Sequence, residues 1–350
     1  MEQEIQTPHK RRVRYKGKYP RKFEEKYKEL QPEKYQDMIE HVIKKGNTPA
    51  GTHISIMVPE ILDTLDIKPG EIGFDATLGY GGHTKAMLAC LNGQGHIYAT
   101  DVDPEESAKT KARLAALGYG EDILTIRLQN FCTIDEIAKE VGGFDFVLAD
   151  LGVSSMQIDN PKRGFSFKVD GPLDLRLNQE AGTSAAERLA TITREELAGM
   201  LYENSDEPYC EELAKAITDE IRKGNAIDTT TKLREVIEKT LDFLPEKEKK
   251  DTVKKTCQRV FQALRIDVNR EFEVLYEFME KLPDALKPGG RVAILTFHSG
   301  EDKLVKKAFK EGYKAGIYAD YAKDVIRPSA QECAQNGRAR STKMRWAVKA

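Results

Sequence analysis

Short apolar runs alternate with helical patterns of apolar residues through the first half of the chain. The runs at about residues 72–75, 95–100, 123–126 and 144–149 predict strands, and the stretches between them predict helices. Strands that are apolar throughout are typical of a parallel sheet covered on both faces. We therefore predict an open α/β sheet, in which ligands bind at the carboxyl ends of the strands.

The pattern changes over residues 172–255. Apolar residues recur there at helical spacing, at 212–221 and 233–244, and strand-like alternation is absent. We interpret this region as a helical insertion and the charged run at residues 246–250 as a solvated connection. An apolar stripe then predicts one long helix over residues 256–282.

The sheet pattern resumes after Gly289 and Gly290 with a strand at residues 291–297, and a last strand follows the basic loop at residues 338–345. A closing strand that follows a Pro-Gly-Gly strand is more typical of methyltransferase sheets than of dinucleotide dehydrogenases.

Composition shows that the whole chain is not a polycation. Lys and Arg number 55 against 57 Asp and Glu, so nucleic-acid binding must come from local patches. Residues 9–22 are such a patch, a basic run with two tyrosines that suits an RNA strand, although a solvated arm is the alternative. No apolar run reaches membrane-spanning length and the charged N-terminus lacks the apolar segment of a signal peptide, so we expect neither a membrane span nor a signal peptide. Its five scattered cysteines have neither disulfide nor zinc spacing, and we expect a cytoplasmic protein without a metal site.

A glycine-rich turn follows the first strand, with glycines at positions 79, 81 and 82. Glycine lets a ligand approach the backbone, and the helix that begins near His83 offers N–H groups to an anionic group. Asp101 ends the second strand about 20 residues later, where nucleotide-type sites place the carboxylate that binds the ribose. A simple connecting turn and a solvated strand end are the alternatives.

The other strand ends also carry residues suited to a ligand. Phe131 follows the third strand and could lie against an adenine or in the core. Asp150 ends the fourth strand. His298 and Ser299 end the strand at residues 291–297, although a lone histidine is more often structural.

Several motifs follow one another along the chain: His53-Ile54-Ser55, Gly79-Tyr80-Gly81-Gly82-His83, Asp150-Leu151-Gly152-Val153-Ser154-Ser155, Arg163-Gly164-Phe165-Ser166-Phe167, Asp170-Gly171-Pro172-Leu173-Asp174-Leu175-Arg176, Phe261-Gln262-Ala263-Leu264-Arg265-Ile266, Phe297-His298-Ser299 and Arg338-Ala339-Arg340-Ser341. Their order and spacing resemble the bacterial enzymes that methylate the exocyclic N4 of a cytosine in 16S ribosomal RNA with S-adenosylmethionine. The resemblance extends from about residue 50 to the C-terminus.

The resemblance implies a Rossmann-like class I methyltransferase sheet with an inserted all-helical substrate domain. The methyltransferase domain would comprise residues 51–171 and 256–350, with the insertion at 172–255 and a basic extension at 1–50. Gly81, Gly82 and His83 would hold the methionine end of the cofactor, and Asp101 would bind its ribose. The full set of cofactor-binding residues would be Gly79, Gly81, Gly82, His83, Asp101, Phe131, Asp150 and Gln157.

Asp150 is also the candidate catalytic residue. A carboxylate that accepts the N–H bonds of a cytosine amine localises its lone pair and stabilises the positive charge that develops. A role in cofactor binding alone is the alternative. No metal or covalent intermediate is expected.

The target base has to leave its stack, and Phe165 or Phe167 could provide a stacking surface unless both are core residues. The residues expected to contact RNA, with structural salt bridges as the alternative for each arginine, are Arg163, Phe165, Phe167, Arg176, Arg265, His298, Ser299, Arg338 and Arg340.

The sequence departs from the family pattern at three places. Gly300 stands where leucine is usual, Gly337 where proline is usual, and Ser205-Asp206-Glu207-Pro208 replaces a Gly-Glu-Glu pattern. These departures leave the target nucleotide open. The expected partner is 16S rRNA in the small ribosomal subunit or its precursor. Another RNA target, a non-catalytic assembly factor and an NAD-dependent dehydrogenase are the competing interpretations, and the sequence does not decide whether the chain forms a homodimer.

Overall fold

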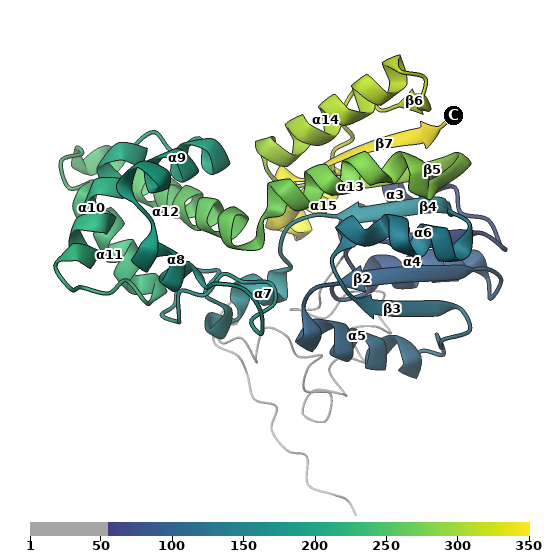
Figure 1. The fold of residues 1–350 in the computed structure, drawn as a ribbon, viewed down its shortest axis with the longest axis horizontal. Coiled ribbons are helices and arrows are strands. Elements are labelled where there is room, and N and C mark those ends of the chain that lie inside the picture. The colour runs from purple at the N-terminus through teal and green to yellow at the C-terminus, as the bar shows by residue number, and fades with distance from the viewer. Residues whose placement is uncertain (1–54) are drawn as a thin grey trace, which may run out of the picture. The chain divides into compact units, whose positions relative to one another are not determined.

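A sheet with helices on both faces makes up the described structure together with a second group of helices, which the chain forms between the fourth and fifth strands (Figure 1). This computed structural model describes residues 55–350. The basic run at residues 9–22 lies outside the described residues. Within residues 55–350, no helix combines the length and apolar character that a membrane crossing requires.

The described residues form one seven-stranded sheet, of order β3-β2-β1-β4-β5-β7-β6. Its first five strands are parallel, and β7 pairs antiparallel with β5 and β6. An antiparallel strand at this place distinguishes the sheet from the dinucleotide-binding order and confirms the predicted closing strand. The strands are β1 (Ile72–Asp75), β2 (His96–Asp101), β3 (Leu124–Leu128), β4 (Phe144–Asp150), β5 (Leu286–Thr296), β6 (Tyr318–Tyr321) and β7 (Lys343–Lys349).

Helices cover both faces of this sheet because its central strands are apolar on both sides. Phe74 and Phe144 pack into the core beneath α6 (Ile134–Val141), α13 (Glu271–Ala285) and α14 (Ser299–Lys314). On the other face, Phe146 packs into the core beneath the helices α3 (Val58–Leu65), α4 (Gly82–Leu91) and α5 (Pro104–Ala116). All three phenylalanines are fully buried, and each burial contributes roughly 1.5–3 kcal/mol.

The helical part has its own core, which extends from Phe165 to Leu264. Its helices are α8 (Ala185–Thr191), α9 (Arg194–Ser205), α10 (Cys210–Arg222), α11 (Thr230–Thr240) and α12 (Glu246–Asn269). Capping boxes start α8 and α9, where a hydroxyl and a glutamate three residues later bond each other's backbone. The remaining elements are α7 (Ser155–Asp159), α15 (Ala330–Gln335) and the 3₁₀ turns η2 (Phe131–Thr133), η3 (Pro161–Arg163) and η4 (Gly337–Ser341).

Two predictions about this region were wrong. The charged run at residues 246–250 is the first turn of α12, so the boundary predicted at residue 255 falls inside a helix. The single helix predicted over residues 256–282 is two helices, because Arg270 adopts a left-handed conformation (φ 52°) that ends α12 and begins α13. Buried residues lie on both sides of Arg270, so the apolar stripe continues across the break and conceals it.

The departure at residues 205–208 has a structural explanation. Glu207 is fully buried and accepts a hydrogen bond of 2.6 Å from Arg259 Nε on α12. It also accepts one from the Tyr209 amide. This carboxylate therefore ties the connection between α9 and α10 to α12.

A pair of glycine substitutions tests this packing. An alanine Cβ at Gly73 would lie 2.0 Å from the Phe146 ring on the neighbouring strand, whereas one at Gly199 in α9 would meet open space. Gly73→Ala should destabilise the protein by about 1–3 kcal/mol. Gly199→Ala should stabilise it by about 0.5–1 kcal/mol. Urea unfolding measures both, and a Gly73→Ala protein as stable as wild type would contradict the packing described here.

Candidate cofactor and active site

Three carboxylates meet at the carboxyl edge of the sheet, since Asp75, Asp101 and Asp150 are the last residues of β1, β2 and β4. Asp75 is 1% exposed and accepts hydrogen bonds from Thr84 Oγ1 (2.5 Å) and the Thr77 amide (3.1 Å). Burial raises its pKa. Sequence reasoning missed Asp75, although it shows the same signal as Asp101, a carboxylate at the end of an apolar strand.

Asp101 lies beside the glycine turn, as its sequence position predicts. Its Oδ2 accepts a hydrogen bond from the Gly79 amide (2.8 Å), and its Oδ1 accepts one from the Asp103 amide (2.9 Å). Burial raises the pKa of Asp101 to about 6. Asp103 and Pro104 are the N-cap and first residue of α5, which confirms the predicted helix start.

The glycine turn requires its glycines. Gly79 and Gly81 have positive φ (47° and 76°), and a Cβ at Gly81 would lie 2.7 Å from Thr110 Cγ2. Gly81 is also the N-cap of α4 and provides no side-chain cap. The first amides of α4 therefore suit a carboxylate such as that of an amino-acid ligand.

His83 connects this helix to Asp150. Its Nε2 lies 2.8 Å from the Ile56 carbonyl, so Nε2 carries a proton and Nδ1 faces Asp150 Oδ2 at 3.4 Å. Burial raises the pKa of Asp150 to about 6, although His83 acts in the opposite direction. Among the described residues, the buried Oδ1 of Asp150 has no hydrogen-bond partner. An orphaned carboxylate oxygen of this kind is suited to accept a hydrogen bond from a bound ligand.

Gln157 and Arg163 both bind Asp103. Gln157 Nε2 donates to Asp103 Oδ2 at 3.0 Å, and Arg163 Nη1 donates to the same oxygen at 2.6 Å. Arg163 Nη2 also donates to the carbonyls of Arg176 and Leu177. Arg163 is 3% exposed. This placement supports a structural role for Arg163 in place of the RNA contact predicted from the sequence.

Of the three aromatic candidates, Phe131 lies beside the sheet, whereas Phe165 and Phe167 lie in the helical part. Phe131 is partly buried at the end of β3 and meets Phe278 edge to face at 5.2 Å between ring centroids. Phe165 is buried in the core of the helical part, and Phe167 packs on that core with its ring 5.6 Å from that of Phe261. The structure therefore favours the core alternative for Phe165 and Phe167.

Most of the arginines expected to contact RNA are paired with carboxylates. Arg176 binds Asp174 through two hydrogen bonds of 2.9 and 2.8 Å. Arg265 binds Glu271 through two of 2.8 Å, and Arg338 binds Asp159 at 2.8 Å. Arg340 is exposed and has no such partner within residues 55–350. Of this set, Arg340 is the guanidinium best placed to reach a phosphate.

His298 and Ser299 follow β5. His298 Nε2 lies 3.3 Å from Glu301 Oε1, and Ser299 is exposed. Glu271, His298 and Glu301 are close enough to hold a metal ion, but both oxygens of Glu271 already bind Arg265. The guanidinium supplies the positive charge that a metal would bring.

Gly300 departs from the family pattern for a steric reason. The ring of Phe272 meets the His298 ring edge on, with 5.6 Å between their centroids. A Cβ at Gly300 would lie 2.6 Å from the Phe272 ring. Glycine at this position therefore accommodates Phe272 against His298.

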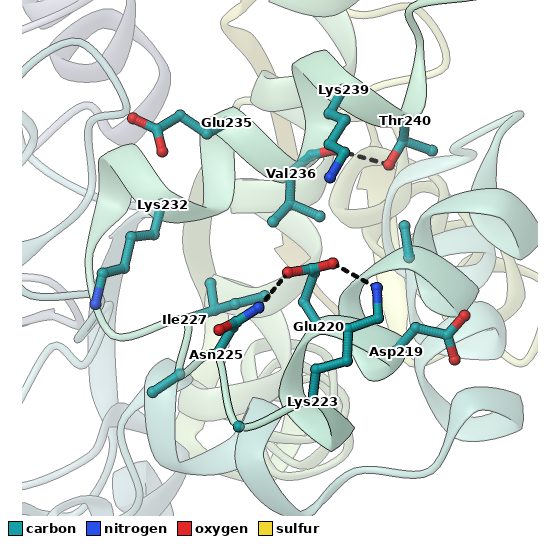
Figure 2. A pocket seen from close by; sticks show the side chains of 13 residues that line it. Asp219, Glu220, Lys223, Asn225, Ile227, Lys232, Glu235, Val236, Lys239 and Thr240 are labelled. Atoms are coloured by element: carbon teal, nitrogen blue, oxygen red, sulfur yellow. Dashed lines mark hydrogen bonds and ion pairs between the residues drawn. The ribbon is translucent and has the colours of Figure 1, made fainter.

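A cavity of about 820 Å³ lies in the helical part, at α10 and α11, and none of the strand-end residues lines it. Three lysines and three carboxylates line it: Lys223, Lys232, Lys239, Asp219, Glu220 and Glu235. Figure 2 shows Glu220 bonded to Lys223 and Asn225. Because these charges balance, the cavity offers no positive field for RNA.

The strand order, the glycine turn after β1 and the carboxylate that ends β2 define a Rossmann-like methyltransferase. The chain belongs to the MraW methylase family, whose model matches residues 50–350. This membership confirms the resemblance inferred from the motifs.

Curated relatives match this chain over nearly its whole length. "Ribosomal RNA small subunit methyltransferase H 1" of Agathobacter rectalis is 84% identical over 98% of both chains. The protein of the same name from Lachnoclostridium phytofermentans is 69% identical over 99% of this chain and 95% of its own. A solved structure of an rRNA methylase from Streptococcus thermophilus is 13% identical, with a TM-score of 0.36 over 83% of this chain and 93% of that one. Similarity at that level supports no statement about function.

Arg163→Met tests the structural role of this residue. It leaves the Asp103 carboxylate buried beside an uncharged side chain, and Arg163 and Asp103 are only 4% and 2% exposed. Loss of one partner from a buried pair should cost about 3–5 kcal/mol in the free energy of unfolding. Arg340→Met is the exposed control and should change the free energy of unfolding by less than about 0.5 kcal/mol. Equal stabilities of the two variants in urea would contradict this assignment.

Proposed function

We propose that the protein transfers a methyl group from S-adenosylmethionine to the exocyclic N4 amine of a cytidine in 16S rRNA of the small ribosomal subunit or its precursor. The observation that carries this proposal is the group of carboxylates around the glycine turn, in which Asp75 is buried, Asp101 and Asp150 are partly buried, and the buried Oδ1 of Asp150 has no hydrogen-bond partner among the described residues. Family membership and the names of the curated relatives support the substrate. We place the enzyme in the cytoplasm, in keeping with its five free cysteines.

The residues at the strand ends fit S-adenosylmethionine, which supplies an electrophilic methyl group on a positively charged sulfur. The amides of Gly82 and His83 would receive the carboxylate of its methionine part, next to Gly81, whose own amide donates to the Leu78 carbonyl at 2.7 Å. Asp101 accepts the ribose hydroxyls, and Phe131 lies beside the adenine. Gln157 contributes indirectly, because its amide is bonded to Asp103 and to the Ser154 backbone.

Asp150 activates the cytosine amine in this proposal. The N4 lone pair is delocalised into the ring, so the amine is a weak nucleophile. Asp150 Oδ1 accepts an N–H bond of the amine, localises the lone pair and takes up the proton that the amine loses. His83 Nδ1 lies 3.4 Å from Oδ2 and lowers the pKa of Asp150, while Asp75 and Glu301 on neighbouring elements raise it.

Asp150→Asn should therefore lower kcat by about 100-fold or more, because the amide cannot accept the proton. In the wild type, kcat should fall as the pH drops below about 6, where Asp150 becomes protonated. Incorporation of labelled methyl groups into small subunits measures both effects at saturating cofactor. Wild-type turnover by Asp150→Asn would remove Asp150 from the catalytic role.

The same substitution should increase stability. The folded-state pKa of Asp150 is raised from 3.8 to about 6, so the folded protein binds more protons than the unfolded chain between these values. Stability from this group is therefore present at low pH and is lost as pH rises from about 4 to 6. At pH 7.5, Asp150→Asn should be more stable than wild type by about 1–3 kcal/mol, a gain that shrinks toward pH 4. Urea unfolding across this range measures the difference, and a gain that grows toward low pH would contradict the assignment.

Mass spectrometry of nucleosides from small subunits incubated with S-adenosylmethionine tests the reaction itself. The proposal predicts N4-methylcytidine in 16S rRNA after incubation with the wild type. Cofactor binding without methyl transfer would identify a non-catalytic assembly factor. A methylated product in another RNA would identify a different target.

A further inference from the structure

Helix α5 holds the glycine turn through side-chain hydrogen bonds. Thr110 Oγ1 donates a hydrogen bond to the Gly79 carbonyl at 2.6 Å. Arg113 Nη2 donates to the Tyr80 carbonyl at 2.8 Å and to Thr110 Oγ1 at 2.6 Å. The Arg113 guanidinium also lies over the Tyr80 ring, with Cζ 3.5 Å from the ring centroid. Two side chains one helical turn apart thus bind two consecutive carbonyls of the turn.

The fit between α5 and the turn is close. Thr110 is fully buried, and its methyl group occupies the space beside Gly81 that any Cβ would need. The Gly79 amide is bonded to Asp101 and its carbonyl to Thr110. Both polar groups of Gly79 are therefore fixed, although glycine alone allows many backbone conformations at this position.

We propose that Thr110 and Arg113 are positioning residues that determine the affinity for the methyl donor. This inference rests on the proposed function, in which the turn holds the methionine part of S-adenosylmethionine. A ligand that binds a loop already held in its bound conformation avoids the cost of ordering that loop. Removal of the two side-chain hydrogen bonds should therefore weaken cofactor binding and leave the chemistry of Asp150 unaffected.

Thr110 allows a matched pair of variants. Thr110→Val keeps the buried volume and loses the hydroxyl, whereas Thr110→Ser keeps the hydroxyl and loses the methyl group. We expect Thr110→Val and Arg113→Met each to raise the Kd for S-adenosylmethionine and S-adenosylhomocysteine about tenfold. Thr110→Ser should stay within about threefold of wild type, and kcat at saturating cofactor should change by less than about twofold in all three.

Calorimetric titration of the full chain gives the Kd values, and methyl transfer gives kcat. The double variant should show less than the product of the two single effects, because Arg113 binds Thr110 directly. Equal Kd values for wild type and Thr110→Val would overturn the inference. A loss of affinity in Thr110→Ser as large as that in Thr110→Val would also overturn it. Such a result would show that the effect does not depend on the hydroxyl. A wild type that binds no S-adenosylmethionine would instead refute the proposed function, and this inference with it.

Discussion

Full burial of one carboxylate and partial burial of two others at one edge of a parallel sheet is the constraint on which the rest of this structure depends. Asp75, Asp101 and Asp150 end three neighbouring strands, and burial raises the pKa of each. A buried carboxylate costs free energy unless it is hydrogen-bonded or paired with a positive charge. Asp75 and Asp101 are satisfied by backbone amides and a threonine, while Asp150 keeps an unpartnered oxygen. These carboxylates therefore reduce the free energy of unfolding. Such a cost is typical of a site in which a bound ligand supplies the missing hydrogen-bond and charge partners.

The same edge is connected to the helical part by a continuous set of polar contacts. Asp101 bonds the Asp103 amide, and the Asp103 carboxylate binds Arg163. Arg163 in turn binds the Leu177 carbonyl, and the Leu177 amide binds Asn269 at the end of α12. Asp101 and the helical part are therefore joined by one set of hydrogen bonds, in which the buried Arg163 has a structural role that needs no contact with RNA.

The sequence predicted the central strands, the start of α5 and the family, because each leaves a local signal. Apolar runs, the Asp103-Pro104 pair and the ordered motifs can all be read without knowing tertiary contacts. The break at Arg270 could not be read, since residues on both sides remain buried and the apolar stripe continues. For Arg163 the sequence left an RNA contact and a structural salt bridge both open, because a buried and an exposed arginine look the same in sequence. Thr110 and Arg113 gave no signal, since they act through backbone carbonyls of a turn about 30 residues earlier.

Calorimetric titration with S-adenosylmethionine at pH 6, in two buffers of different ionisation enthalpy, tests most directly whether these carboxylates form a cofactor site. Asp101 and Asp150 have pKa values raised to about 6, so each is partly protonated at this pH. A positively charged ligand and donated hydroxyl groups both favour the ionised form. The account predicts one-site binding with release of protons to the buffer. Binding with no net proton release, or no binding at all, would contradict it.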